Sequence, residues 1–140
     1  MVISTDIIKG VLISHMKTIT SVTDELASVN EVREVQWKGD TFEYPNLRLR
    51  IIRNVPQDGE CAVDMSAGWL VFTQDQSSAK CDEISGIIAT YFKGKQFSVT
   101  FQGNAYHLSL GRVTIIPAVS VGVLAWRSEV VVEGYLSLIT

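Results

Sequence analysis

The sequence predicts an α+β fold in which two α-helices pack against one mainly antiparallel β-sheet. Two segments, near residues 5–19 and 78–93, carry apolar residues at the three-to-four-residue spacing of a helix face. The segments between and after them alternate apolar and polar residues, as β-strands do. Two helices are too few to cross between all the strands, so we expect most neighbours to be antiparallel. The chain of 140 residues fits one domain, residues 1–140.

The N-terminal helix is predicted from its cap and its apolar stripe. Residues 4–6, Ser-Thr-Asp, have side chains that can accept a bond from a free backbone N–H. The stripe that follows consists of Ile8, Val11, Leu12, His15, Met16 and Ile19. The run 18–23 is rich in β-branched and hydroxyl residues, so we expect the helix to fade there. Residues 24–40 fit either a short strand around 32–37 or an irregular segment, with a turn at Gly39-Asp40.

Two strands and a second helix are predicted in the middle of the chain. Residues 47–51 alternate leucine or isoleucine with arginine, the pattern of a half-buried strand, and a turn at 56–59 should end it. Residues 61–73 are apolar almost throughout, which indicates a central strand covered on both faces. The serines at 77 and 78 should cap the second helix, and Gly94 should end it.

The last third of the sequence is predicted to be strand throughout. Residues 97–110 alternate apolar and polar side chains on either side of a hairpin turn at Gln102-Gly103-Asn104. Apolar and β-branched residues then dominate 113–139. Within this stretch, Pro117 and Gly122 mark a bulge, a break or a loop.

No motif with the spacing of a catalytic, nucleotide-binding or metal-binding site is present. The sequence lacks a nucleophile elbow, a phosphate loop and a dinucleotide fingerprint. His15 and His107 have no further ligands at suitable spacing, and a core or interface role is the commoner explanation for His15. The cysteines, Cys61 and Cys81, match no zinc motif and are typical of thiols in a reducing cytoplasm. We therefore expect no enzymatic activity, no metal and no cofactor.

The composition favours a folded, soluble, intracellular protein. Apolar residues make up 46% of the chain and charged residues 19%, which argues against disorder. The net charge of −3 gives no reason to expect strong binding to nucleic acid or to an acidic membrane surface. The N-terminus lacks the basic region and cleavage site of a signal peptide, and no stretch reaches the roughly 18 apolar residues of a membrane span.

The arginines Arg48, Arg50 and Arg53 form the one notable charge feature. Arg48 and Arg50 lie on the same face of the predicted strand, and an ordinary solvated face would account for both. The alternative is a subunit contact with acids such as Glu129 or Glu133, or a basic rim that faces DNA. No aromatic residues are interleaved with these arginines, which weakens the case for a dedicated nucleic-acid site.

Three local features are similar to one family of proteins. Tyr44-Pro45 leads into the strand at 47–53, and the strand Val63–Thr73 runs into a capped helix that ends at Lys93-Gly94-Lys95. Ala125-Trp126-Arg127-Ser128 precedes a long final strand. With the order helix, strand, strand, helix, strands, the chain resembles the tail terminator proteins of long-tailed bacteriophages over nearly its whole length.

The resemblance implies a structural virion protein that is assembled in the host cytoplasm. Such a protein forms a ring, commonly of six subunits, that caps the tail tube, stops its polymerisation and presents the surface that joins the head. Its partners would be copies of itself, the tail tube protein and a head–tail connector, while genomic DNA could pass through the ring without sequence-specific binding. The residues expected at its interfaces are Arg48, Arg50, Arg53, Trp126 and Glu129, together with the sheet edges and the loops 53–61 and 73–78.

Two alternatives stay open. One is another phage neck or connector protein, or a tube-end protein of a contractile injection device. The other is a small ligand-binding or enzymatic α+β domain, which would need polar side chains that converge in a pocket.

Overall fold

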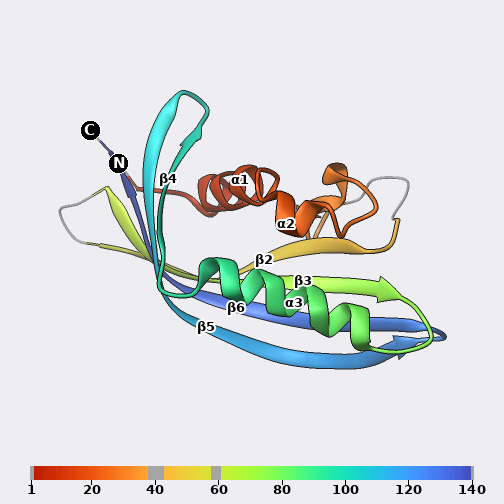
Figure 1. The fold of residues 1–140 in the computed structure, drawn as a ribbon. Helices are drawn as coiled ribbons and strands as arrows, with labels where there is room; N and C mark the ends of the chain where they lie inside the picture. Colours follow the sequence, from red (N-terminus) through yellow and green to blue (C-terminus); the bar gives the residue numbers. More distant parts are fainter. Residues whose placement is uncertain (1, 38–42, 58–60, 140) are drawn as a thin grey trace.

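The computed structural model describes residues 2–37, 43–57 and 61–139, and the chain forms three α-helices and six strands within them (Figure 1). The elements in chain order are α1 (Thr5–Met16), α2 (Thr20–Thr23), the 3-10 turn η1 (Val29–Glu31), β1 (Val32–Glu34), β2 (Asn46–Pro56), β3 (Ala62–Gln74), α3 (Ala79–Phe92), β4 (Gln96–Phe101), β5 (Asn104–Gly122) and β6 (Ala125–Leu138). None of the described helices is long and apolar enough to span a membrane.

The six strands form one sheet in the order β1-β2-β3-β6-β5-β4. Every neighbouring pair is antiparallel except β1 and β2, which run parallel over three residues, Val32–Glu34 beside Leu47–Leu49. The predicted α+β fold with a mainly antiparallel sheet is therefore confirmed, and the short parallel pair is an addition to it. β3 lies inside the sheet, and nearly all of its side chains are buried, as the apolar run predicted.

Both long helices begin close to the predicted positions, but the first one ends earlier. The Ser4 hydroxyl accepts a bond from the Ile7 N–H (3.3 Å), which confirms the N-terminal cap. α1 ends at Met16 instead of residue 19 because Ile19 adopts an extended backbone, and the chain then forms the separate four-residue helix α2. The β-branched run that follows Met16 predicted this loss of helix but not the new turn.

The end of α3 follows the prediction more closely than its start. Ser78 stands at the N-cap, yet its side chain makes no capping bond, and the Ser77 hydroxyl instead accepts one from the Ala79 N–H (3.3 Å). Gly94 has φ of +64°, the left-handed conformation of a helix-ending glycine. The Gln102-Gly103 turn also has positive φ at both residues, which confirms the predicted hairpin.

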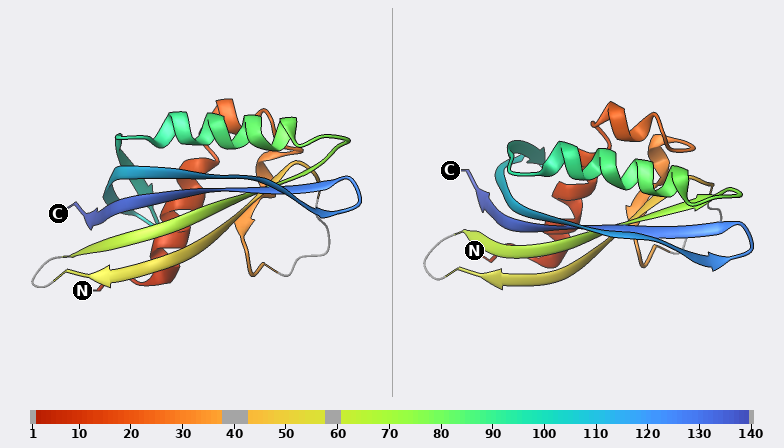
Figure 2. Two further views of the ribbon diagram at one scale, coloured as in Figure 1. Left: turned by 90° about the horizontal axis from the view of Figure 1, so that it is seen from below. Right: turned by 60° about the horizontal axis from the view of Figure 1, so that its bottom comes forward.

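The hydrophobic core lies between the helices and one face of the curled sheet. In both views of Figure 2 the strands lie between the viewer and α1, so that α1 packs behind them. Alternate residues of β3, including Trp69 and Val71, point into this core beside Ile8, Leu12 and Ile88 from the helices. Trp69 is fully buried there.

β5 and β6 form a long hairpin that extends beyond the part of the sheet covered by the helices (Figure 1). β5 continues through Pro117, where its pairing with β6 shifts between Ile116 and Val119. The predicted irregularity at Pro117 is thus a bulge within one strand, since a proline has no N–H to donate there. The predicted turns at Gly39-Asp40 and Asp58-Gly59 lie outside the described residues.

Candidate assembly surface

The outer face of the sheet, which points away from the helices, carries paired charges. Arg50 on β2 bonds to Glu129 on β6 through two parallel contacts, Nε to Oε2 at 2.6 Å and Nη2 to Oε1 at 2.9 Å. The bonds span β3, whose residue between them is Gly68. A Cβ at position 68 would overlap the Glu129 carboxylate, so the glycine leaves the space that the ion pair occupies.

The Arg50–Glu129 pair is already satisfied within the chain. The Glu129 side chain is 8% exposed, whereas that of Arg50 is 47% exposed. The hydrogen bond from Arg50 to the carboxylate raises the pKa of the guanidinium above its ordinary value. The predicted partners therefore meet inside one chain, where their geometry is that of a bidentate arginine–carboxylate bond.

Arg53 and Arg112 make looser pairs on the same face. Arg53 Nη2 lies 2.8 Å from Asp64 Oδ1, and both side chains are substantially exposed. Arg112 Nε lies 4.0 Å from Glu133 Oε2. Glu133, which the sequence offered as a partner for the arginine stripe, thus faces a different arginine.

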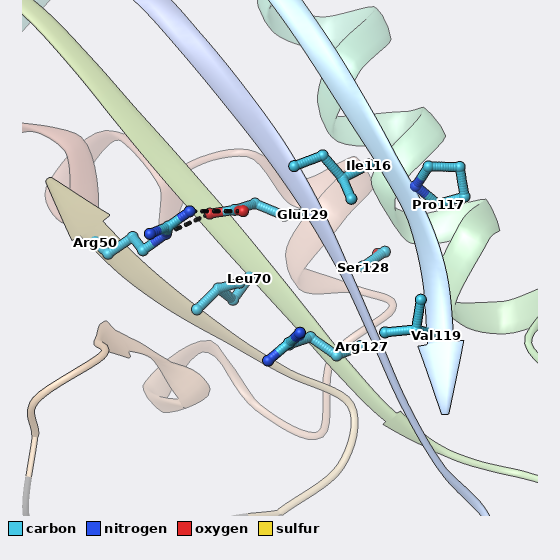
Figure 3. A pocket seen from close by; sticks show the side chains of 8 residues that line it. All are labelled: Arg50, Leu70, Ile116, Pro117, Val119, Arg127, Ser128 and Glu129. Atoms are coloured by element: carbon cyan, nitrogen blue, oxygen red, sulfur yellow. Dashed lines mark hydrogen bonds and ion pairs between the residues drawn. The ribbon is translucent and has the colours of Figure 1, made fainter. Parts of the chain in front are cut away.

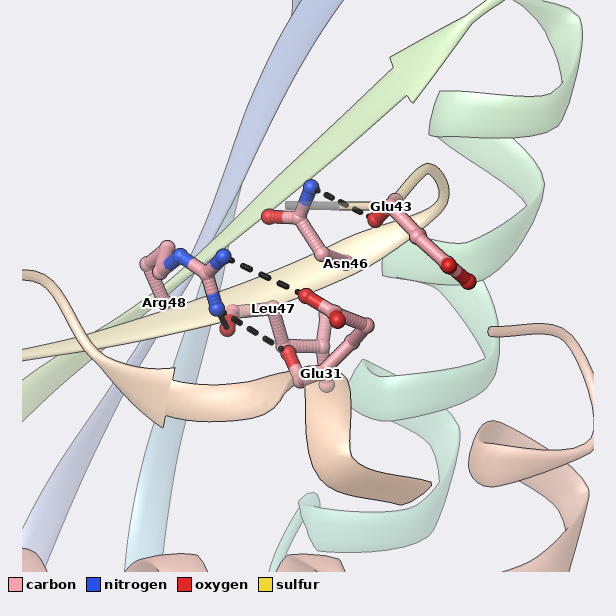
Figure 4. Close-up of polar contacts among 5 residues, drawn as sticks. All are labelled: Glu31, Glu43, Asn46, Leu47 and Arg48. Carbon is pink, nitrogen blue, oxygen red and sulfur yellow. Dashed lines mark hydrogen bonds and ion pairs between the residues drawn. The ribbon is translucent and has the colours of Figure 1, made fainter. Parts of the chain in front are cut away.

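Arg48 is not on a solvated face, and that expectation is wrong. Its residue is 3% exposed, and its guanidinium bonds to the backbone and carboxylate oxygens of Glu31 at 3.3 and 3.4 Å (Figure 4). Loss of water around the group lowers the pKa of Arg48. The Trp37 ring, shortly after β1, lies 5.9 Å from the Arg48 guanidinium carbon.

The burial of Arg48 changes its role. An exposed arginine could bind a neighbouring subunit, but Arg48 holds η1 against β2 inside its own chain. The alternating pattern of β2 could not reveal that Arg48 is buried. Glu31, which binds it, lies 17 residues earlier, in a segment whose structure the sequence did not predict.

A hollow of about 350 Å³ lies on the outer face beside the Arg50–Glu129 pair (Figure 3). Its remaining lining consists of Leu70, Ile116, Pro117, Val119, Arg127 and Ser128. Arg127 is exposed and makes no ion pair with the described part of the chain. The hollow therefore combines apolar walls with one guanidinium that a partner's carboxylate could approach.

Exposed apolar side chains gather on the far half of the β5–β6 hairpin. Ile115, Ile116, Val119, Val121, Val123 and Leu124 are each at least 44% exposed, and Val123 is 90% exposed. None of them belongs to the buried core cluster. Consecutive strand residues point to opposite faces, so Ile115 and Ile116 lie on different faces of the hairpin. Exposed apolar residues concentrated in one short segment mark a contact site more often than scattered single ones do.

Trp126, next to the turn of this hairpin, is half-buried and makes contacts within its own chain. Its indole Nε1 donates to the Asp75 carbonyl at 3.0 Å, and the Asp75 N–H donates to the Leu124 carbonyl at 2.8 Å. These bonds tie the loop after β3 to the hairpin turn. The predicted contact loop 73–78 is therefore held beside the apolar hairpin, while residues 53–56 of the other predicted loop belong to β2.

His15 belongs to an aromatic cluster between α1, α3 and β4. Its ring lies 4.5 Å from Phe97 and 5.9 Å from Tyr91, centroid to centroid. Burial lowers the pKa of His15 below 6.5. Among the described residues no three His, Cys, Asp or Glu side chains are placed to hold a metal ion, and Cys61 and Cys81 are free thiols.

Sequence reasoning missed one contact that positions this surface. The Asp82 carboxylate accepts a bond from the Ala118 N–H at 2.9 Å, which fixes α3 to the bulge of β5. The exposed hairpin did have a signal, because residues 113–124 are apolar without the polar alternation that a half-exposed strand requires.

These features define a class of protein rather than an individual one: a small α+β domain with an uncovered, ion-paired sheet face and an exposed apolar hairpin. The chain matches no protein-family model and no curated protein. Its function has to be inferred from the surface itself.

Proposed function

We propose that this chain is a structural subunit of a bacteriophage tail, and specifically a ring-forming tail terminator. In this role several copies, commonly six, form a ring on the end of the tail tube, stop its polymerisation and provide the surface that joins the head. The partners are copies of the same chain, the tail tube protein and the head–tail connector. The virion is the expected location.

The observation that carries the proposal is the exposed apolar hairpin. Burying one Ile or Val side chain contributes about 1.5–3 kcal/mol, and this hairpin exposes six large apolar side chains to water. The core is complete without them. A subunit that functions inside an assembly would bury such residues against its neighbours, since symmetric rings join one surface patch to a different patch on the next subunit.

The arrangement of charges supports an assembly role over an enzymatic one. The hollow on the outer face is lined by Arg50 and Glu129, which already bind each other through two parallel hydrogen bonds. A general acid or base needs a group that can exchange a proton with a substrate. The free Arg127 suits a contact with a carboxylate on a partner protein better than proton transfer.

The interface assignment changes for two of the five residues proposed from the sequence. Arg48 is internal, and Glu129 is almost fully buried beneath Arg50. Arg50, Arg53 and Trp126 retain exposed atoms and stay candidates for subunit contacts. Arg127 joins them, because its guanidinium faces the hollow beside the apolar side chains of β5.

The proposal is tested in a phage that encodes this chain. Deleting the gene should give tails of uncontrolled length that fail to join heads, and supplying the wild-type chain from a plasmid should restore both properties. Tails of normal length that lack heads would assign the chain to the connector region instead. Normal tails with heads attached would eliminate both assignments.

A further inference from the structure

The sheet is open at two diagonally opposite corners. β1 pairs only with Leu47–Leu49 of β2, so the outer side of residues 50–56 has no strand beside it within the described chain. β4 pairs only with the first part of β5, residues 104–109, so the outer side of 111–122 is likewise open. Each lateral side of the sheet thus has one covered half and one open half.

Both open segments expose apolar side chains. Ile52 and Val55 on β2 are 47% and 44% exposed, and Ile115 and Ile116 on β5 are 44% and 46% exposed. An open strand edge presents unpaired N–H and C=O groups, and single domains normally protect such edges with charges, prolines or short strands. Arg50, Arg53 and Pro56 on β2 and Arg112 on β5 give partial protection of this kind. Both edges are nevertheless long and keep exposed isoleucine or valine side chains, which indicates that each is covered in the working assembly.

The two edges are complementary in direction. Within the sheet β2 is antiparallel to β3, β3 to β6, and β6 to β5, so β2 and β5 run in opposite directions. A second copy in the same orientation would place its β2 beside β5 of the first copy as an antiparallel neighbour. Such a contact joins different patches on the two copies, and it leaves each copy with one further edge free for the next.

We propose that copies of this chain join edge to edge, with residues 50–56 of β2 in one copy paired antiparallel to residues 111–116 of β5 in the next. This inference rests on the proposed ring and names its interface. The occupant of each edge is a second copy, because the edge that each copy offers is an antiparallel, β-branched strand of matching length. Backbone hydrogen bonds between the two strands stabilise the contact, and the exposed isoleucine and valine side chains add apolar contacts.

The fold itself sets the limits of the pairing. Pro117 has no N–H, and the Ala118 N–H is already taken by Asp82, so β5 cannot continue the pairing past residue 116. The open halves lie toward opposite ends of the strands, and the neighbour is therefore shifted along the strand direction. A shift of this kind is what a closed ring of tilted strands requires.

Cysteine cross-linking tests the interface directly. The half-buried Cys61 is first replaced by serine, while the buried Cys81 is retained. Cysteine is then placed at Ile52 or Val55 on β2 and at Ile115 or Ile116 on β5, which gives four double variants and four single ones. Each purified full-length chain is treated with a short bismaleimide and examined on a denaturing gel, and its native mass is measured in parallel.

We expect at least one double variant to form a ladder of covalent oligomers, while every single variant stays monomeric on the gel. Dimers from a single β5 variant would show β5 paired with β5 and would overturn the inference. The absence of cross-links from all four double variants, with an oligomeric native mass, would also overturn it but would leave the proposed ring in place. A monomeric native mass for the wild-type chain would eliminate the ring and the edge contact together.

Lysine at the edge provides an independent readout. Val55→Lys and Ile115→Lys place a charge on each open edge and should weaken self-association at least tenfold without loss of the fold. Val29→Lys is the matched control, because Val29 is similarly exposed on η1 away from both edges. Its effect should stay below twofold. Equal weakening by all three variants would contradict a specific edge contact.

Discussion

Arg50 and Glu129 are joined across an intervening strand, and the residue between them is a glycine. The carboxylate of Glu129 lies over Gly68 of β3 and receives both of its bonds from the Arg50 guanidinium. The Glu129 side chain is nearly buried, whereas the Arg50 side chain is about half-exposed. The pair therefore connects β2, β3 and β6 on the one face of the sheet that the helices do not cover.

Removing Arg50 should destabilise the fold, because it leaves the Glu129 carboxylate without its charged partner. We expect Arg50→Met to lower the free energy of unfolding by about 1–3 kcal/mol. Arg53→Met is the matched control, since the exposed Arg53–Asp64 pair should contribute less than about 1 kcal/mol. Urea denaturation of both variants gives the comparison, and equal losses would contradict the special role of the Arg50 pair.

Reversing the charge of Arg48 should prevent stable folding. Arg48→Glu would place a second carboxylate beside the buried Glu31, and we expect a loss of about 3–5 kcal/mol or insoluble protein. Arg53→Glu, on the exposed part of the same strand, should stay soluble and close to wild type. Circular dichroism and thermal melting distinguish the two. A well-folded Arg48→Glu protein would show that the Glu31 contact contributes little.

Two glycines should respond to alanine with opposite signs. Gly134 on β6 faces β5 so closely that a Cβ would overlap the Ser109 carbonyl and the Leu110 backbone. Gly134→Ala should therefore separate the hairpin strands and lower the melting temperature. Gly86 lies within α3 with open space around it, so Gly86→Ala should raise stability by about 0.5–1 kcal/mol. A stabilising effect at position 134 would contradict the packing.

The stability of the fold should fall with pH below about 6.5, in part because of His15. Burial lowers the pKa of His15 in the folded chain, so the unfolded chain binds a proton first as the pH falls below 6.5. The resulting loss of unfolding free energy is absent above pH 6.5. It grows as the pH falls from 6.5 toward the pKa that His15 has in the folded chain. His15→Phe should remove it, so that the variant loses less unfolding free energy than wild type between pH 7.5 and 5. Identical pH profiles would show that His15 carries no such penalty.

The sequence predicted the elements that depend on local chemistry. The cap at Ser4, the helix end at Gly94 and the hairpin at Gln102-Gly103 each depend on neighbouring residues or on a conformation that glycine adopts easily. The apolar run of β3 predicted its central place because burial on both faces removes polar alternation. The mainly antiparallel sheet was expected for a different reason, namely that two long helices are too few to connect all the strands as parallel neighbours.

The candidate site was harder to predict because long-range contacts decide it. The alternation in β2 made Arg48 and Arg50 look equivalent, yet Glu31 covers one and Glu129 binds the other. Neither partner can be assigned before the order of strands is known. Glu129 was suggested as a partner for arginine on another subunit, whereas the strand order brings it within reach of Arg50 in its own chain.

The native mass of the wild-type chain, measured by native mass spectrometry across a hundredfold range of concentration, tests the central claim most directly. The proposed ring predicts one closed species, with six times the mass of the chain as the expected value, and no ladder of intermediate sizes. It also predicts that this species persists on dilution, because a closed ring loses no subunit without breaking two contacts. A chain that stays monomeric across the whole range would contradict the claim that its exposed hairpin and open strand edges serve to build a ring.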